Sequence, residues 1–148
     1  MTTTTTMTMT MTIDLWSLFG SSFLAATFLP FASEVHLAYL AKSQNLYILL
    51  LVATVGNTLG GLTNFGLGYL AKIEWAHRYL RIKENDILKA KALVHRFGLI
   101  LAFFTFLPVV GDPIAFVLGL NRERIIPVTL LMSAGKLLRY AFILFVIA

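Results

Sequence analysis

Residues 19–40 read FGSSFLAATFLPFASEVHLAYL, and residues 97–118 read FGLILAFFTFLPVVGDPIAFVL. The two stretches align without a gap, and both contain the sequence Thr-Phe-Leu-Pro. A carboxylate follows at the same position in each copy, as Glu34 and as Asp112. We interpret the stretches as an internal repeat, because an unbroken tetrapeptide and a matched acid rarely coincide by chance in apolar sequence. The identical pairs are Phe19/Phe97, Gly20/Gly98, Thr27/Thr105, Phe28/Phe106, Leu29/Leu107, Pro30/Pro108 and Leu40/Leu118.

The composition of the chain is typical of a membrane protein. Of its 148 residues, 58% are hydrophobic and only 13% are charged, and the mean hydropathy is +0.82. A soluble domain of this length could not bury so much apolar surface, so we expect a lipid bilayer as the solvent. The length predicts a single domain. The sequence has no cysteine, and its three histidines are far apart, which argues against disulfides and against a metal site.

Each copy of the repeat contains an apolar leg that is broken at proline. The first leg, 14–29, would extend about 24 Å as a helix, which is short of a hydrocarbon core of about 30 Å. Pro30 interrupts it before a second leg at 34–41, and Pro108 interrupts the later leg in the same way. If each hairpin enters and leaves the bilayer on one side, each unit crosses once. The sequence then predicts an inverted-topology repeat of re-entrant hairpins.

Two longer apolar segments, 46–71 and 125–147, are predicted transmembrane helices. In the first, small residues and one asparagine recur every four positions and form one face suited to close helix packing. These residues are Gly56, Gly60, Asn64 and Gly68. The fold class that we expect is therefore an all-α integral membrane protein, with a single membrane domain over 1–148.

Within this domain, repeat 1 covers 14–71 and repeat 2 covers 97–148. Residues 1–12 are a Thr/Met tract without a basic n-region or a cleavage site, and we expect a disordered tail there. Between the repeats, apolar and charged residues alternate over 72–96. We interpret this segment as one or two amphipathic helices on the cytoplasmic membrane face, with a solvated connector as the alternative.

The basic residues are concentrated on one predicted side. They lie in the segment 72–96 and in the short loop 121–124, which the repeat places on the same side. This is the distribution expected for cytoplasmic loops, so we predict a multi-pass protein of the cell inner (cytoplasmic) membrane and no nucleic-acid partner. The basic residues in question are Lys72, Arg78, Arg81, Lys83, Lys89, Lys91, Arg96, Arg122 and Arg124.

Ionisable residues also fall at apparent membrane depth, namely Glu34, Asp112, Lys136 and Arg139. Each would cost at least about 2.5–3.5 kcal/mol at the centre of an isolated helix. Lys136 and Arg139 are three residues apart and share a helix face. The repeat alignment places them opposite Asn57 and Gly60, so we expect both hairpin acids and these helix positions to meet near the midplane.

Together these residues form a candidate anion site. Half-helix N-termini point their positive dipole ends inward, and with Lys136 and Arg139 they would hold a phosphate. Glu34 and Asp112 would exchange protons or gate the site. Asn57 and Asn64 complete the substrate- or proton-binding set, although interhelical hydrogen bonding is their alternative role.

Structural roles are open for the charged residues as well. Asp112 before Pro113 has the pattern of a helix N-cap, and Ser33 could cap the leg that begins at Glu34. Lys136 and Arg139 could form purely structural ion pairs. We also assign structural roles to residues that break or pack the helices: Pro30, Ser33, Gly56, Gly60, Gly61, Pro108, Gly111 and Pro113.

Four motifs in this order resemble the YqaA-like branch of the DedA/VTT (SNARE-associated) membrane-protein superfamily. They are Ser-Ser-Phe-Leu-x-Ala-Thr-x-Leu-Pro-x-x-Ser-Glu (21–34), Gly-Asn-x-Leu-Gly-Gly-Leu-Thr-Asn (56–64), Pro-Val-Val-Gly-Asp-Pro (108–113) and Gly-Lys-x-Leu-Arg-Tyr (135–140). The resemblance implies re-entrant hairpins that face each other, lipid translocation, dependence on the proton gradient and envelope stress tolerance. Glu34 matches the family's first-hairpin acid. The second hairpin departs from the pattern, because it carries Asp112 and no arginine.

We therefore expect a flippase or scramblase that moves an anionic lipid, either a phospholipid or a polyprenyl phosphate, between leaflets with proton coupling. Its partners would be anionic lipid headgroups and protons, and its small size favours an open groove or a homodimer. The sequence shows no catalytic residue, cofactor motif or metal cluster, so we do not expect an enzyme. The alternative is a non-transporting membrane scaffold or chaperone for envelope homeostasis.

Overall fold

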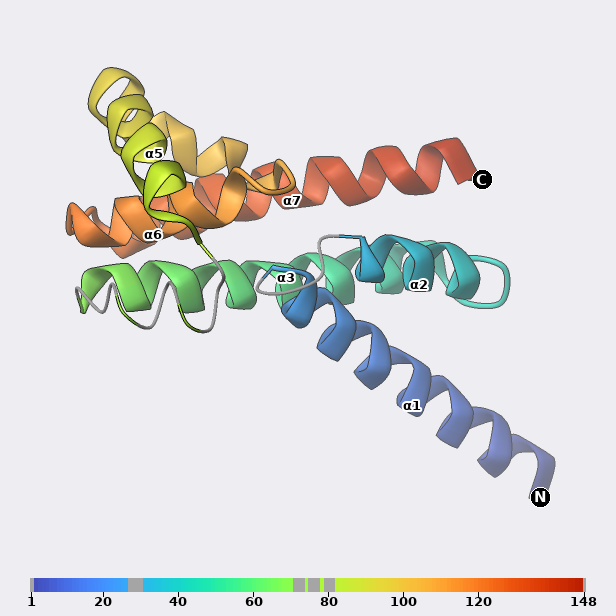
Figure 1. Ribbon diagram of the computed structural model, residues 1–148. Helices are drawn as coiled ribbons and strands as arrows, with labels where there is room; N and C mark the ends of the chain where they lie inside the picture. The colour runs from blue at the N-terminus through green and yellow to red at the C-terminus, as the bar shows by residue number, and fades with distance from the viewer. Residues whose placement is uncertain (1, 27–30, 71–73, 75–77, 79–81, 148) are drawn as a thin grey trace.

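The computed structural model describes every residue except 1, 27–30, 71–73, 75–77, 79–81 and 148, and the described part is helical with no strand (Figure 1). In chain order, the elements are α1 (Thr2–Ala25), α2 (Ala32–Leu40), α3 (Leu46–Tyr69), α5 (Glu84–Phe97), the 3₁₀ helix η1 (Gly98–Phe106), α6 (Gly111–Leu120) and α7 (Ile125–Ile147).

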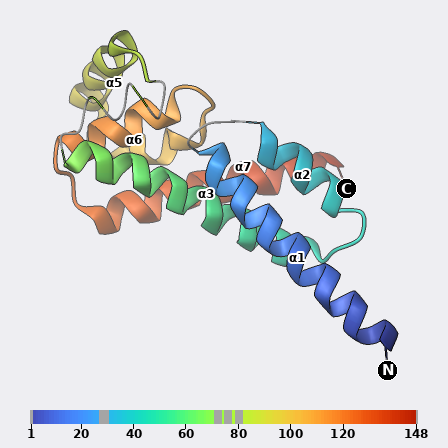
Figure 2. The same cartoon turned by 60° about the horizontal axis from the view of Figure 1, so that its bottom comes forward.

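Helices α3 and α7 form the central pair and run antiparallel to each other along the long axis of the molecule (Figures 1 and 2). Both are long and apolar enough to cross a membrane, which confirms the two long helices predicted from the sequence. With 24 residues, α3 is roughly 36 Å long. It begins after Asn45, whose side chain accepts a hydrogen bond of 2.9 Å from the Tyr47 N–H as an N-cap.

The two short helices lie on opposite halves of this pair. Helix α2 has 9 residues and α6 has 10, so each is roughly 15 Å long, about half of a hydrocarbon core. Both start near the middle of the molecule and run toward opposite ends (Figures 1 and 2). Helix α1 ends at Ala25 before α2 begins, but Pro30 lies outside the described residues. Pro108 lies in the break between η1 and α6.

The expectation of a disordered tail over 1–12 differs from the structure, in which α1 already begins at Thr2. Threonine hydroxyls donate hydrogen bonds to the carbonyl oxygens one turn earlier, from Thr8 to Thr4 (2.6 Å) and from Thr12 to Thr8 (3.0 Å). These bonds keep the hydroxyls within the helix. The tract also extends an apolar helix that is already formed, which avoids the cost of a new helix nucleus.

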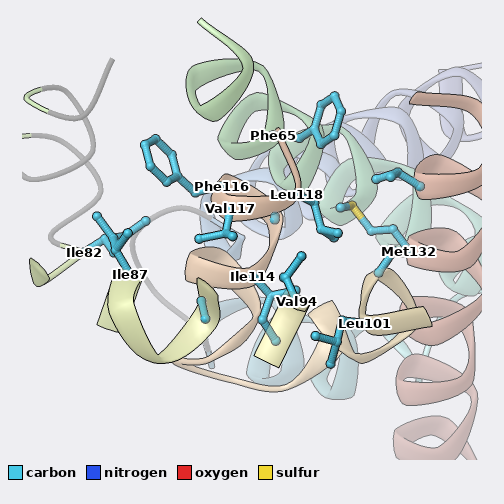
Figure 3. Packing of buried hydrophobic residues seen from close by; sticks show 14 residues of the cluster. Phe65, Ile82, Ile87, Val94, Leu101, Ile114, Phe116, Val117, Leu118 and Met132 are labelled. Carbon is cyan, nitrogen blue, oxygen red and sulfur yellow. The ribbon is translucent and has the colours of Figure 1, made fainter. Parts of the chain in front are cut away.

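The predicted amphipathic helix is present over Glu84–Phe97, as α5. Its buried residues Ile87, Ala90 and Val94 pack against α6 and η1, whereas Leu88 and Phe97 remain exposed. Most of the preceding stretch, 72–83, lies outside the described residues. Figure 3 shows the cluster into which α5 packs, where Val94 approaches Ile114 of α6 and Ile87 lies beside Ile82.

Close backbone contacts at glycine hold the helices together. A Cβ atom added to Gly68 of α3 would lie 1.9 Å from the carbonyl oxygen of Phe116, and one added to Gly119 of α6 would lie 1.9 Å from that of Phe65. Helices α3 and α6 therefore cross through a reciprocal pair of glycines. Gly56 and Gly60 admit the backbone of α1 in the same manner, which agrees with the small-residue face predicted for α3.

Candidate functional site

The acid of the first hairpin pairs with the last helix. Glu34, in the first turn of α2, forms a salt bridge with Arg139 of α7, and their side chains are 24% and 17% exposed. The other terminal nitrogen of Arg139 donates a hydrogen bond of 2.6 Å to the carbonyl oxygen of Phe106, the last residue of η1. Arg139 thereby joins the start of one short helix to the end of the leg that precedes the other.

The acid of the second hairpin lies beside the other predicted cation. Asp112, in the first turn of α6, accepts a hydrogen bond of 3.0 Å from the side-chain amide of Asn64. Lys136 is 3% exposed and interacts electrostatically with Asp112, while its Nζ donates to the backbone carbonyl oxygen of Asn57. Asn64 also donates to the carbonyl oxygen of Ala26 at 2.9 Å. Since both of its partners are acceptors, the NH₂ group of Asn64 must face them.

Tyr140 connects these two groups, and the sequence analysis gave it no role. Its hydroxyl accepts a hydrogen bond of 2.7 Å from the Asn57 side-chain amide and lies 2.9 Å from the Ser33 hydroxyl. Tyr140 is 1% exposed, so these partners replace water. The available signal was its position: a tyrosine four residues after Lys136 shares the lysine's helix face.

The structure excludes the simple capping roles. Helix α6 begins at Gly111 with Val110 at the N-cap, so Asp112 lies inside the first turn and its carboxylate bonds Asn64. Helix α2 has Phe31 at the N-cap without a side-chain cap, and the Ser33 hydroxyl bonds Tyr140. In both helices, the side chain that local sequence rules predicted as an N-cap instead forms a hydrogen bond with a residue of α3 or α7.

Two of the predicted structural glycines make room for the site. A Cβ atom at Gly61 would lie 2.7 Å from Lys136 Nζ, so the absence of a side chain leaves space for the lysine nitrogen. At Gly111 a Cβ atom would lie 2.1 Å from the carbonyl oxygen of Thr105, which lets α6 start directly against η1. Pro113 is buried in the first turn of α6.

A largely apolar pocket of about 480 Å³ opens at the Glu34–Arg139 pair. Its walls come from the start of α2, the end of η1 and the C-terminal half of α7. The two charged side chains thus face a space otherwise lined by hydrophobic residues and proline, which are Phe31, Phe106, Pro108, Leu138, Phe142 and Ile143. Lys136, Asp112 and the two asparagines lie outside this pocket lining.

Each of the six predicted substrate- or proton-binding residues therefore either belongs to α7 or contacts α7 or a helix packed against it. They fall into two groups: Glu34 with Arg139 at the pocket, and Lys136, Asp112, Asn57 and Asn64 in the interior. The first group is accessible to an anion that enters the pocket. The second group is enclosed, and its polar atoms mostly bond one another.

Comparison with known proteins gives relatives but no structural precedent. No family model and no solved structure matches the chain. The chain is similar to the inner membrane protein YqaA of Escherichia coli (strain K12), with 38% identity over 130 residues that cover 86% of this chain and 87% of that protein. A protein of Haemophilus influenzae described as uncharacterized is 34% identical over 137 residues, covering 86% and 83% of the two chains.

Proposed function

Because the chain belongs to the YqaA family of inner membrane proteins, we propose that it is a multi-pass DedA/VTT-type protein that moves an anionic lipid between leaflets. The observation that carries this proposal is the Glu34–Arg139 pair in the wall of the apolar pocket. An arginine that is partly exposed in an apolar groove can take a lipid phosphate while the groove accommodates the acyl chains.

The arrangement of the short helices supports re-entrant hairpins. Helices α2 and α6 are each about half of a bilayer core in length, and their N-termini lie near the middle of the α3–α7 pair. The first turns of both carry an acid next to α7. Gly56 and Gly135, which the repeat alignment pairs, admit the backbones of α1 and η1 respectively. Two units of opposite orientation account for this correspondence.

In the proposed cycle, the lipid phosphate competes with Glu34 for Arg139. Protonation of Glu34 weakens the salt bridge and leaves the guanidinium to the phosphate, while the Phe106 carbonyl keeps Arg139 directed at the groove. Deprotonation restores the pair and expels the headgroup. Proton transfer is thereby coupled to lipid entry and exit, and the glycine contacts between α3 and α1 provide the surface on which the first hairpin moves.

Lipid movement in liposomes tests this function. The purified full-length protein is reconstituted with fluorescent phosphatidylglycerol or a labelled polyprenyl phosphate, and loss of label from the inner leaflet is followed with an impermeant quencher. We expect Glu34→Gln and Arg139→Ala to slow movement at least tenfold, roughly the effect of losing one charge-assisted hydrogen bond. The matched controls Glu84→Gln and Arg96→Ala change exposed residues of α5 and should retain the wild-type rate.

Two results would count against this function. If wild type and variants all fail to move either lipid while remaining folded, the non-transporting scaffold becomes the better explanation. If lipid moves at equal rates in wild type and in both site variants, the pocket is not the pathway. An imposed pH gradient that leaves the wild-type rate unchanged would remove the proton coupling alone.

A further inference from the structure

A second pocket lies at the opposite end of the molecule from α2. It has a volume of about 500 Å³ and is formed by the C-terminal end of α3 and the connection from α6 to α7. These two segments lie at the same end of the molecule in both ribbon views (Figures 1 and 2). Its lining includes apolar side chains, one tyrosine and two arginines, among them Leu62, Phe65, Tyr69, Arg122, Arg124 and Ile125.

The backbone holds Arg122 in a conformation that is unfavourable for a side chain. Its φ of 55° is in the left-handed region, at the position after a helix where glycine is usual. The Arg122 N–H donates a hydrogen bond of 2.8 Å to the carbonyl oxygen of Gly119, which closes the end of α6. The guanidinium carbon lies 5.2 Å from the ring centroid of Tyr69, so the side chain is placed over that ring.

The pocket lies where the two candidate spans end. Tyr69 is the last residue of α3 and Ile125 is the first of α7, and both helices are long and apolar enough to cross a membrane. In an inserted protein, arginine and tyrosine side chains at these positions lie at the level of the lipid headgroups. The apolar part of the pocket, formed by Leu62 and the exposed Leu70, then faces the acyl chains.

The charge of the pocket is net positive. Glu123 also lines it, but within the described part of the chain neither Arg122 nor Arg124 forms an ion pair with this or any other carboxylate. Two guanidinium groups therefore stand at the headgroup level without a carboxylate partner. Phosphate is the anion that guanidinium binds in a bidentate manner, and it is abundant at this depth.

We propose that this pocket binds the headgroup phosphate of an anionic phospholipid, which remains there as a bound lipid. The two arginines contact the phosphate, Tyr69 packs beneath Arg122, and an acyl chain lies against Leu62 and Leu70. A zwitterionic lipid binds less well, because its choline or ethanolamine cation is repelled by the second arginine. This inference requires only that the protein is in a membrane, and it is independent of the proposed transport.

Native mass spectrometry of the full-length protein in detergent tests the proposal. Dioleoyl phosphatidylglycerol and dioleoyl phosphatidylcholine are added separately, and the bound fraction is measured against lipid concentration. We expect wild type to prefer phosphatidylglycerol, and we expect the double variant Arg122→Gln/Arg124→Gln to bind it about tenfold more weakly. The control Lys89→Gln/Lys91→Gln removes the same charge from exposed positions of α5 and should bind as wild type does.

A second variant tests the site without removing its arginines. Glu123→Gln removes the carboxylate from the lining and should strengthen phosphatidylglycerol binding several-fold, a result that misfolding cannot imitate. Unchanged binding in Glu123→Gln, or equal loss in the arginine and lysine variants, would refute a local site. Inorganic phosphate at equal concentration should not displace the lipid, because it gains nothing from the apolar wall, and full displacement would overturn the assignment to a phospholipid.

Discussion

One face of α7 organises the polar interior of the molecule at the scale of single residues. Lys136, Arg139 and Tyr140 are spaced so that their side chains leave the helix on the same side. Lys136 contacts the backbone of α3, Arg139 reaches α2 and η1, and Tyr140 joins α2 to α3. Because these three side chains bond polar groups of other helices, changing one of them leaves its partner without that bond.

Lys136 and Asp112 provide a test of this dependence. Replacing Lys136 by methionine keeps the volume but removes the donor to the Asn57 carbonyl oxygen and the positive charge near Asp112, and we expect a loss of about 1–3 kcal/mol in unfolding free energy. In Lys136→Met/Asp112→Asn, no uncompensated charge remains, so part of the loss should be recovered. Unfolding of the purified protein in mixed detergent measures both values, and equal stability of the single and double variants would contradict an electrostatic interaction between Lys136 and Asp112.

At the scale of elements, the arrangement depends on how closely α3 can approach its neighbours. Along one face of α3, Gly56 and Gly60 contact α1, Asn64 bonds Asp112 of α6, and Gly68 contacts the α6 backbone. The residues that recur every four positions along α3 thus contact α1 of the first hairpin at one end and α6 of the second hairpin at the other. Close packing of this kind is the main source of helix association where lipid already solvates apolar surfaces.

Alanine substitutions at two glycines of α3 distinguish the effect of helix packing on stability from the effect of helix propensity. Gly68→Ala would place a Cβ atom 1.9 Å from the Phe116 carbonyl oxygen, so α6 must move and we expect destabilisation of about 1–3 kcal/mol or more. Gly66→Ala meets nothing within 4 Å and should keep wild-type stability or gain slightly. Thermal unfolding of both variants measures the difference, and equal stability would show that α3 and α6 do not cross through these glycines.

At the scale of the whole molecule, the antiparallel α3 and α7 separate two ends of different charge. The end that holds the start of α7 also holds α5 and the loop with Arg122 and Arg124, whereas the α2–α3 connection lies at the other end (Figure 1). If α3 and α7 cross a membrane, α5 and this loop lie on the same side of it, which is the distribution that the positive-inside rule predicts for cytoplasmic loops.

Single-cysteine labelling tests this topology directly, because the natural sequence has no cysteine. With a membrane-impermeant thiol reagent, we expect Gln44→Cys to react from outside the cell. Asn121→Cys should react only from the cytoplasmic side. Phe31→Cys and Val110→Cys, at the two hairpin breaks, should react slowly from either side, because re-entrant hairpins place them within the bilayer. Labelling of Gln44→Cys and Asn121→Cys from the same side would contradict the crossing of α3.

The sequence by itself determined the helices and breaks that depend only on neighbouring residues along the chain. Continuous apolar runs predicted α3 and α7, alternating polarity predicted α5, and a proline with adjacent turn residues predicted the break between η1 and α6. The sequence also identified the buried ionisable residues, because a charge in an apolar segment is recognisable without any coordinates. The Thr/Met tract was predicted wrongly, since its helix follows from continuity with the leg that comes after it.

Only the tertiary structure decided which of these residues meet. Glu34 pairs with Arg139 across more than a hundred residues, and Asp112 bonds Asn64 where a local rule predicted a helix cap. The role of Tyr140 likewise depends on Ser33 and Asn57, which belong to other helices. Such pairings depend on the rotation and crossing of packed helices, and these are set by the contacts of all the helices together. Sequence periodicity gives the face of a helix, but the neighbour of that face is chosen by the fold.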